Sequence, residues 1–198
     1  MKMITFGILF LSVYLAGSIN FAILVLGAIG KADPRTQFSG NAGTTNVYRQ
    51  AGLVWAAVVL LLDLGRAMAT AVLAVHFLPV DAVPWIGFSL ILGNRFPCFH
   101  RFRGGKGVAG FLGFTLLLSP AVAAVAACIW VAVHHLVRVP FIASFFMITV
   151  LAIGTAIIYN YRCLAVTGTL VTALLIFYNH RRNIAALLQK QGKSHESS

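Results

Sequence analysis

The segment 140–158 reads PFIASFFMITVLAIGTAII and contains no charged residue. An uninterrupted apolar stretch of about this length is what an α-helix needs to cross the hydrocarbon core of a bilayer. Similar stretches recur along the chain to about residue 179, so one cleaved signal peptide cannot account for them. The sequence therefore predicts an all-α membrane protein.

The composition supports this fold class. Of the 198 residues, 60% are hydrophobic and only 10% are charged, whereas a soluble domain has about a quarter charged residues. We predict a single domain over residues 1–198, with a flexible tail at 188–198. We expect seven transmembrane helices, of which the third and fourth are short for a full crossing. The seven helices are expected at residues 4–28, 52–78, 84–98, 107–119, 120–138, 140–158 and 163–179.

The net charge of +11 is concentrated in the connections between apolar segments. The basic residues of the segments 29–51, 94–107, 134–140 and 180–198 are Lys31, Arg35, Arg49, Arg95, Arg101, Arg103, Lys106, Arg138, Arg181, Arg182, Lys190 and Lys193. Seven helices put all of them on one side and leave Lys2 and Arg162 on the other. The positive-inside rule then predicts an outside N-terminus and a cytoplasmic C-terminus. It explains the positive charge better than nucleic-acid binding does.

The first polar segment that could carry chemistry reads FSGNAGTTNVYR and covers residues 38–49. Glycines permit close backbone approach, and Thr45 or Asn46 can cap the helix that follows. Free N–H groups at a helix start, with Arg49 about one turn in, form an anion site. The alternative is an ordinary polar turn.

A second polar segment reads GNRFP at 93–97 and continues as FRGGKGV at 102–108. Glycines around Lys106 allow backbone amides and an ammonium group to converge on one oxyanion. The spacing is not that of a P-loop, so nucleotide hydrolysis is unsupported. The alternative is a basic juxtamembrane loop that contacts anionic lipid head groups.

Two further features are less specific. His180 and Asn183 lie three residues apart and share a face if the tail is helical, although a basic stop after the last span explains this region equally well. Asp63 and Arg66, within the second helix, are favoured as a structural ion pair because unpaired charges at membrane depth are costly. The three cysteines are far apart, and we expect no metal site.

The acidic residues number only four in the whole chain. They provide no paired carboxylates or Ser-His-Asp set for strong acid–base catalysis. Phosphate capture is better provided for. Such a protein suits a substrate that is already activated, to which it contributes proximity and electrostatic stabilisation.

The sequence resembles the PlsY-type acyl-phosphate:glycerol-3-phosphate acyltransferase family. The resemblance covers nearly the whole chain, and its motifs lie at residues 17–19, 39–49, 62–63, 102–109 and 180–184. It implies a multi-pass enzyme of the bacterial inner membrane with a cytoplasmic active site. The implied reaction transfers a fatty acyl group from acyl phosphate to the 1-hydroxyl of glycerol-3-phosphate, giving lysophosphatidic acid and phosphate. It also implies that no cofactor, metal or obligatory protein partner is needed, only the substrates and membrane lipids.

The resemblance assigns functional residues by position. Ser39, Lys106 and Asn183 are the expected catalytic residues. The expected substrate-binding residues are Gly40, Asn41, Gly43, Thr45, Asn46, Arg49, Gly104, Gly105, Gly107, Ser144 and His180.

The chain also departs from the family pattern. The family usually has lysine and glycine at Arg66 and Ala67, histidine at Asn94 and an acidic residue at Arg182. Asparagine does not titrate near neutral pH as histidine does. A weakly active paralogue with an altered substrate, or a transporter or binding protein for a phosphorylated metabolite, therefore remains an alternative.

Overall fold

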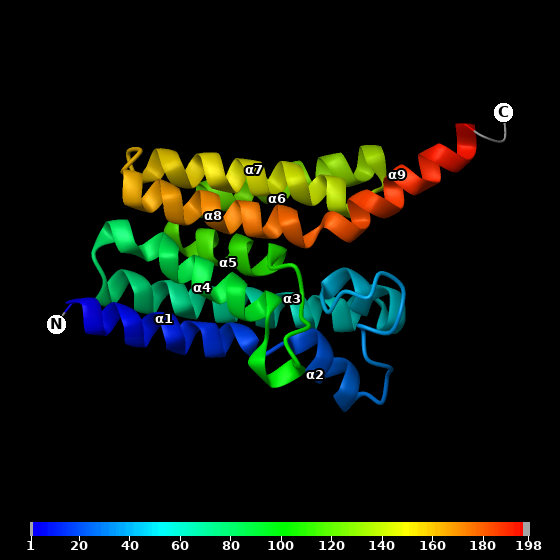
Figure 1. Ribbon diagram of the computed structural model, residues 1–198, viewed down its shortest axis with the longest axis horizontal. Coiled ribbons are helices and arrows are strands. Elements are labelled where there is room, and N and C mark those ends of the chain that lie inside the picture. Colours follow the sequence, from blue (N-terminus) through cyan, green and yellow to red (C-terminus); the bar gives the residue numbers. More distant parts are fainter. Residues whose placement is uncertain (1, 196–198) are drawn as a thin grey trace.

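The computed structural model describes the backbone of residues 2–195 and the side chains of residues 3–189. Within that part of the chain all regular structure is helical (Figure 1). The elements are α1 Lys2–Ser18, α2 Phe21–Ala28, α3 Thr44–Phe77, η1 Val80–Ala82, α4 Val83–Arg95, η2 Cys98–His100, α5 Val108–Leu118, α6 Pro120–Val137, α7 Pro140–Ile158, α8 Cys163–Asn179 and α9 Arg181–His195. The segment expected to be a flexible tail is helical through His195, and residues 196–198 lie outside the described part.

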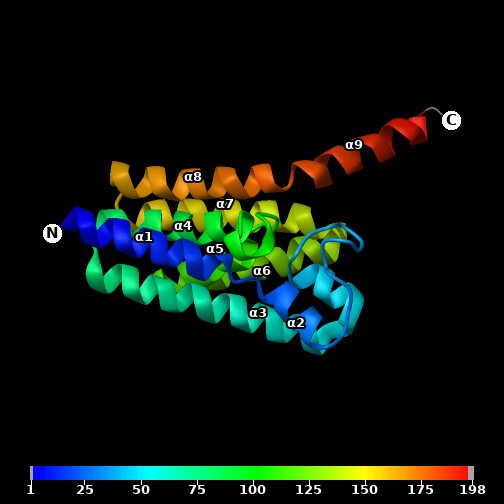
Figure 2. The same ribbon diagram turned by 60° about the horizontal axis from the view of Figure 1, so that its bottom comes forward.

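The longer helices lie roughly parallel or antiparallel to one common axis, as Figures 1 and 2 both show. Helix α1 packs on α4, α3 on α5, α4 on α8 and α6 on α7. The N-terminus lies at one end, whereas α2, the connection before α3, the α6–α7 turn and α9 lie toward the other (Figure 2). The polar segments at 38–49 and 180–184 thus lie toward the same end of the bundle.

Two glycines allow α1 and α4 to approach closely. A Cβ atom at Gly17 would collide with the carbonyl oxygen of Leu90, and one at Gly93 would collide with that of Tyr14. Small residues of this kind let membrane helices pack backbone against backbone. This contact fixes the end of α4, which leads into the glycine-rich loop.

The predicted first helix is broken into α1 and α2. Asn20 caps α2 by accepting a hydrogen bond from the backbone N–H of Ile23 (3.1 Å). Arg66 of α3 donates to the carbonyl of Ile19 and pairs with Asp63 (2.7 Å). The expectation of an Asp63–Arg66 ion pair is confirmed, and the pair also satisfies a carbonyl freed by the break.

Helix α3 begins at Thr44, earlier than the predicted start at residue 52. Gly52 adopts φ +83° and kinks the helix there, a conformation that glycine adopts without steric cost. The predicted cap by Thr45 or Asn46 is wrong, because both lie inside the helix. Gly43 is the N-cap residue, and it makes no side-chain capping bond.

Several helices have the length and apolar character needed to cross a membrane. They are Met3–Ala28, Thr44–Phe77, Pro120–Val137 and Pro140–Ile158, with α8 and the start of α9 as a fifth, bent candidate. Helix α5 is apolar but shorter, and α4 has only 13 residues. The structure is therefore that of a multi-helix membrane protein.

Candidate functional site

The loop before α3 is held in place by the side chain of Asn46. Its amide nitrogen donates to the carbonyls of Pro34 (2.6 Å) and Gln37 (3.0 Å). Its amide oxygen is 3.5 Å from the hydroxyl of Ser39, which donates to it. Asn46 is 1% exposed, whereas Ser39 is exposed. Asn46 therefore fixes the conformation of the loop, and the loop exposes the side chain of Ser39 at the surface.

The N–H groups expected to bind anions are mostly occupied. The N–H groups of Gly40 and Gly43 donate to Gln37 and Asn41, and those of Gly104 and Gly105 donate to Arg95 and Asn94. This corrects the prediction for Gly104 and Gly105, whereas the N–H of Gly107 has no acceptor among the described residues. The first N–H groups of α3, at Thr44 and Thr45, lack a hydrogen-bond acceptor within the described residues. These two N–H groups, at the positive N-terminal end of the α3 dipole, are available to bind an anion.

The glycines of the second loop serve close packing. A Cβ atom at Gly105 would lie 2.7 Å from the carbonyl oxygen of Ala42 and equally close to Oδ1 of Asn94. Gly107 has φ +92°. The loop therefore lies directly against the loop before α3. Asn94, near the end of α4, is buried, and its Oδ1 is unpaired among the described residues.

Lys106 joins this loop to the junction of α8 and α9. Its ammonium group donates to Oδ1 of Asn183 (2.6 Å), and its carbonyl accepts from the amide of Asn179 (3.2 Å). Burial, with the nearby charges of Arg49 and Arg95, lowers the pKa of Lys106 to about 8. A half-buried ammonium among other cations is poised to gain an anionic partner.

His180, at the end of α8, is neutral. It is 2% exposed, and burial, with the charge of Lys106, lowers its pKa to about 4. Its Nδ1–H donates to the carbonyl of Ile176 (2.8 Å), because a carbonyl can only accept. The ring also packs edge-on against Phe145. Nε2 is therefore left as a hydrogen-bond acceptor.

Ser144 precedes Phe145 on α7 and is buried. Its hydroxyl donates to the carbonyl of Pro140 (3.0 Å) and accepts from the indole N–H of Trp130 (3.2 Å). These bonds join α6 to α7. A substrate contact by Ser144 stays a prediction.

Sequence reasoning missed the clamp that ties the two loops together. Arg35 pairs with Asp33 (2.6 Å) and donates to the carbonyls of His100 (2.7 Å) and Arg103 (3.2 Å). Hydrogen bonding to Arg35 lowers the pKa of Asp33. The only sequence signal was the Asp-Pro-Arg spacing at 33–35, which is common in turns.

The remaining cations of the site lack carboxylate partners. Asp33, Asp63 and Asp81, which are the described acidic residues, pair with Arg35, Arg66 and Arg162. Arg49, Arg95, Lys106, Arg181 and Arg182 have no carboxylate partner among the described side chains, nor do these include a cluster fit to hold a metal. The site is therefore a cationic cluster suited to phosphate groups.

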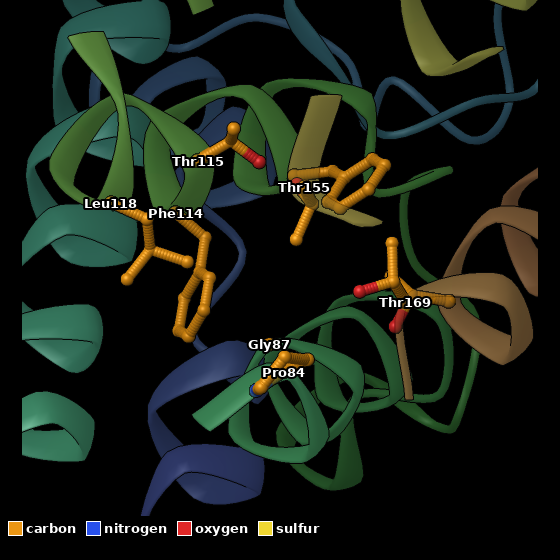
Figure 3. Close-up of a pocket in the computed structure, with 9 residues that line it drawn as sticks. Pro84, Gly87, Phe114, Thr115, Leu118, Thr155 and Thr169 are labelled. Carbon is orange, nitrogen blue, oxygen red and sulfur yellow. The ribbon is translucent and has the colours of Figure 1, made fainter. Parts of the chain in front are cut away.

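A separate small cavity lies within the helical bundle, and none of the residues of this cationic cluster lines it. It has room for about one water molecule. Figure 3 shows Thr115, Thr155 and Thr169 around it, with Phe114 and Pro84. None of its lining residues is a predicted site residue.

Comparisons with known proteins find relatives over nearly the whole chain. The sequence profile of the family described as "Glycerol-3-phosphate acyltransferase" matches residues 7–190. A protein of that name from Methylobacillus flagellatus is 40% identical over 179 residues, covering 90% of this chain and 91% of its own length. One from Pseudomonas fluorescens is 38% identical over 183 residues, covering 92% and 95%.

The solved structures that resemble this chain come from the same family. The crystal structure of PlsY (YgiH), an integral membrane glycerol 3-phosphate acyltransferase, in its glycerol 3-phosphate form has a TM-score of 0.87 and 32% identity, covering 93% of this chain and 92% of that one. Its lysophosphatidic acid form has a TM-score of 0.84 and 30% identity, with the same coverage. The chain therefore belongs to the glycerol-3-phosphate acyltransferase family of integral membrane proteins.

Proposed function

We propose that this protein transfers a fatty acyl group from acyl phosphate to the 1-hydroxyl of glycerol-3-phosphate, the first step of phospholipid synthesis. The observation that carries the proposal is the cluster of cations without carboxylate partners around Lys106. Family membership supplies the acceptor, because the matched relatives are named for it. The acyl phosphate donor fits a site without an evident protein nucleophile or strong base.

The reaction needs little covalent help from the protein. The hydroxyl oxygen of glycerol-3-phosphate attacks the carbonyl carbon of acyl phosphate, and the bond from that carbon to the phosphate oxygen breaks. Inorganic phosphate leaves and accepts the hydroxyl proton. No cofactor or metal enters this sequence. The protein holds two anions together and stabilises the charge that develops.

The residues divide between the two substrates. Ser39 and the loop of Gly40 to Gly43 lie at the acyl phosphate, with the free N–H groups at the start of α3 beside them. Arg49, Lys106 and Asn183 hold the phosphate of glycerol-3-phosphate. Lys106 has further ammonium hydrogens to offer beyond its bond to Asn183. Nε2 of the neutral His180 is left to accept a hydrogen bond from a donor group of the substrate.

The membrane arrangement follows from the positions of the loops. We place seven helical crossings in the bacterial inner membrane, counting α1 with α2 as one and α4 and α5 as short crossings. The N-terminus then lies outside, and the pocket lies at the cytoplasmic face, where both substrates are water-exposed at their phosphates. The basic loops satisfy the positive-inside rule in this orientation. We propose no obligatory protein partner.

A direct experiment supplies palmitoyl phosphate and glycerol-3-phosphate to the purified protein and follows both phosphate and lysophosphatidic acid. Equal amounts of the two products are expected. Lys106→Ala and Arg49→Ala should each raise the KM for glycerol-3-phosphate by roughly tenfold or more, because each removes a charge-assisted contact. Arg138→Ala, an exposed change in the α6–α7 turn, is the control. Phosphate release without acylated product would indicate a hydrolase, and unchanged kinetics in both site variants would refute the assignment.

A further inference from the structure

Four threonines line the small cavity inside the bundle, at the place where α4, α5, α7 and α8 meet. They are Thr115 of α5, Thr155 of α7, and Thr169 and Thr172 of α8, and all four are buried. Figure 3 shows the first three of them around the cavity. The rest of the wall is formed by proline, glycine, phenylalanine and leucine. Polar side chains from three helices therefore share one space in surroundings that are otherwise apolar.

Two of these hydroxyls lack a hydrogen-bond partner. The Oγ1 atoms of Thr115 and Thr155 are buried and unpaired among the described residues, and the two residues are 1% and 3% exposed. A threonine in a helix often satisfies its hydroxyl by donating to the carbonyl one turn earlier, as Thr149 does to Phe145 (2.9 Å). Because a polar group buried inside a membrane protein is costly without a partner, the two hydroxyls indicate a ligand in the cavity.

The other two threonines have the opposite requirement. Thr169 donates to the carbonyl of Ala165 (3.0 Å), and Thr172 donates to that of Gly168 (2.7 Å). Since the hydrogens of these hydroxyls are already used, each oxygen can only accept a further bond. The cavity thus combines two hydroxyls with a free hydrogen and two that can only accept. A water molecule, which can both donate and accept hydrogen bonds, matches this set.

We propose that the cavity is a binding site for one ordered water molecule, which accepts hydrogen bonds from Thr115 and Thr155 and donates to Thr169 and Thr172. The space fits about one water molecule, and a larger ligand is excluded.

The bound water connects helices that carry residues of the cationic cluster. Helix α5 packs against α7, and α7 packs against α8. The water adds a hydrogen-bonded link from α5 and α7 to α8. Helix α5 begins just after Lys106, and α8 ends just before His180. The water site therefore stabilises the packing of the two helices that lead to these residues.

Valine substitutions test the site through the sign of their effect, because valine has the shape of threonine without the hydroxyl. The measurement is the half-life of unfolding at one fixed temperature, followed by circular dichroism of the full-length protein in detergent. Thr115→Val and Thr155→Val should each shorten it by roughly fivefold, because each removes one partner of the water. The double variant should unfold no faster than the faster single variant, since it no longer holds an unpaired hydroxyl. Thr149→Val, at an exposed position of α7, is the control and should stay within about twofold of the wild type.

A high-resolution crystal structure of the wild type gives an independent measurement. It should show electron density for a water molecule within hydrogen-bond distance of Oγ1 of both Thr115 and Thr155. Direct bonding of these two hydroxyls to each other, or a cavity without such density, would overturn the proposal.

The unfolding rates can overturn it as well. Single valine variants that unfold as slowly as the wild type, or more slowly, would show that the hydroxyls have no ligand, because removal of an unpaired buried hydroxyl stabilises a protein. Effects that simply add in the double variant would show that the two hydroxyls do not share one water molecule.

Discussion

The titration of Lys106 provides a quantitative test of the pocket. Lowering the pKa of this lysine from 10.5 to about 8 corresponds to roughly 3 kcal/mol of destabilisation of the ammonium form in the empty pocket. The phosphate of glycerol-3-phosphate should restore the ordinary affinity for the proton. Binding above about pH 8 therefore has to take up a proton, whereas binding below it does not.

The expected result is a dissociation constant that is flat below about pH 8 and rises by about tenfold per pH unit above it. Neither His180 nor the substrate phosphate titrates in the range from about pH 7 to about pH 9.5, so the pH dependence there reports on Lys106. His180, with its pKa lowered to about 4, stays neutral, and a phosphate monoester with a second pKa of about 6 stays dianionic. Calorimetric titration without the acyl donor measures this directly, and buffers of different ionisation enthalpy count the proton.

Two substitutions at the same position serve as controls. Lys106→Arg should remove the pH dependence, because guanidinium does not titrate in this range. Lys106→Met should also be flat but weaker by roughly tenfold to a hundredfold, from the lost charged hydrogen bond. A wild-type affinity that is constant up to about pH 9.5, or a slope that persists in Lys106→Arg, would refute the reasoning.

Three further predictions follow from the packing of the loops. Arg35→Ala should lower turnover by roughly tenfold and leave the helical circular dichroism unchanged, because it releases the clamp on the carbonyls of the second loop; unchanged turnover would show that the clamp is dispensable. Gly105→Ala should cost roughly 1–3 kcal/mol in stability by forcing the loops apart, and thermal unfolding can compare it with Gly65→Ala, where a Cβ atom meets no other atom within 4 Å. Asn46→Leu, which removes all three hydrogen bonds of this side chain to the preceding loop, should speed proteolysis near residue 38, and resistance equal to wild type would contradict its role.

The positions of the apolar helices could be predicted because hydropathy alone decides them. Residues 140–158 form α7 with the expected bounds, and 163–179 form α8 likewise. The breaks could not be predicted in the same way. The end of α1 depends on Arg66 reaching the Ile19 carbonyl from α3, a contact between distant segments. The early start of α3 was missed because residues 44–51 are too polar to signal a membrane helix.

The sequence predicted the charged residues of the site, but it did not predict which backbone N–H groups are free to donate hydrogen bonds. The distribution of basic residues predicted that Arg49, Lys106 and the tail gather at one end, and Lys106 does contact Asn183. Which N–H groups remain free depends on the loop conformation, so the amides of Gly104 and Gly105 were misassigned. Arg35 was missed because its partners are backbone carbonyls, which any sequence supplies.

The central claim is that separate polar segments form one pocket at the cytoplasmic face, and membrane-sided labelling tests it most directly. Single cysteines at Thr45, Arg103 and Ala185, which are all exposed, are introduced after Cys98, Cys128 and Cys163 are replaced by alanine. A membrane-impermeant maleimide should label all three sites in inside-out vesicles and none in right-side-out vesicles. Labelling of any two from opposite sides of the membrane would contradict the account.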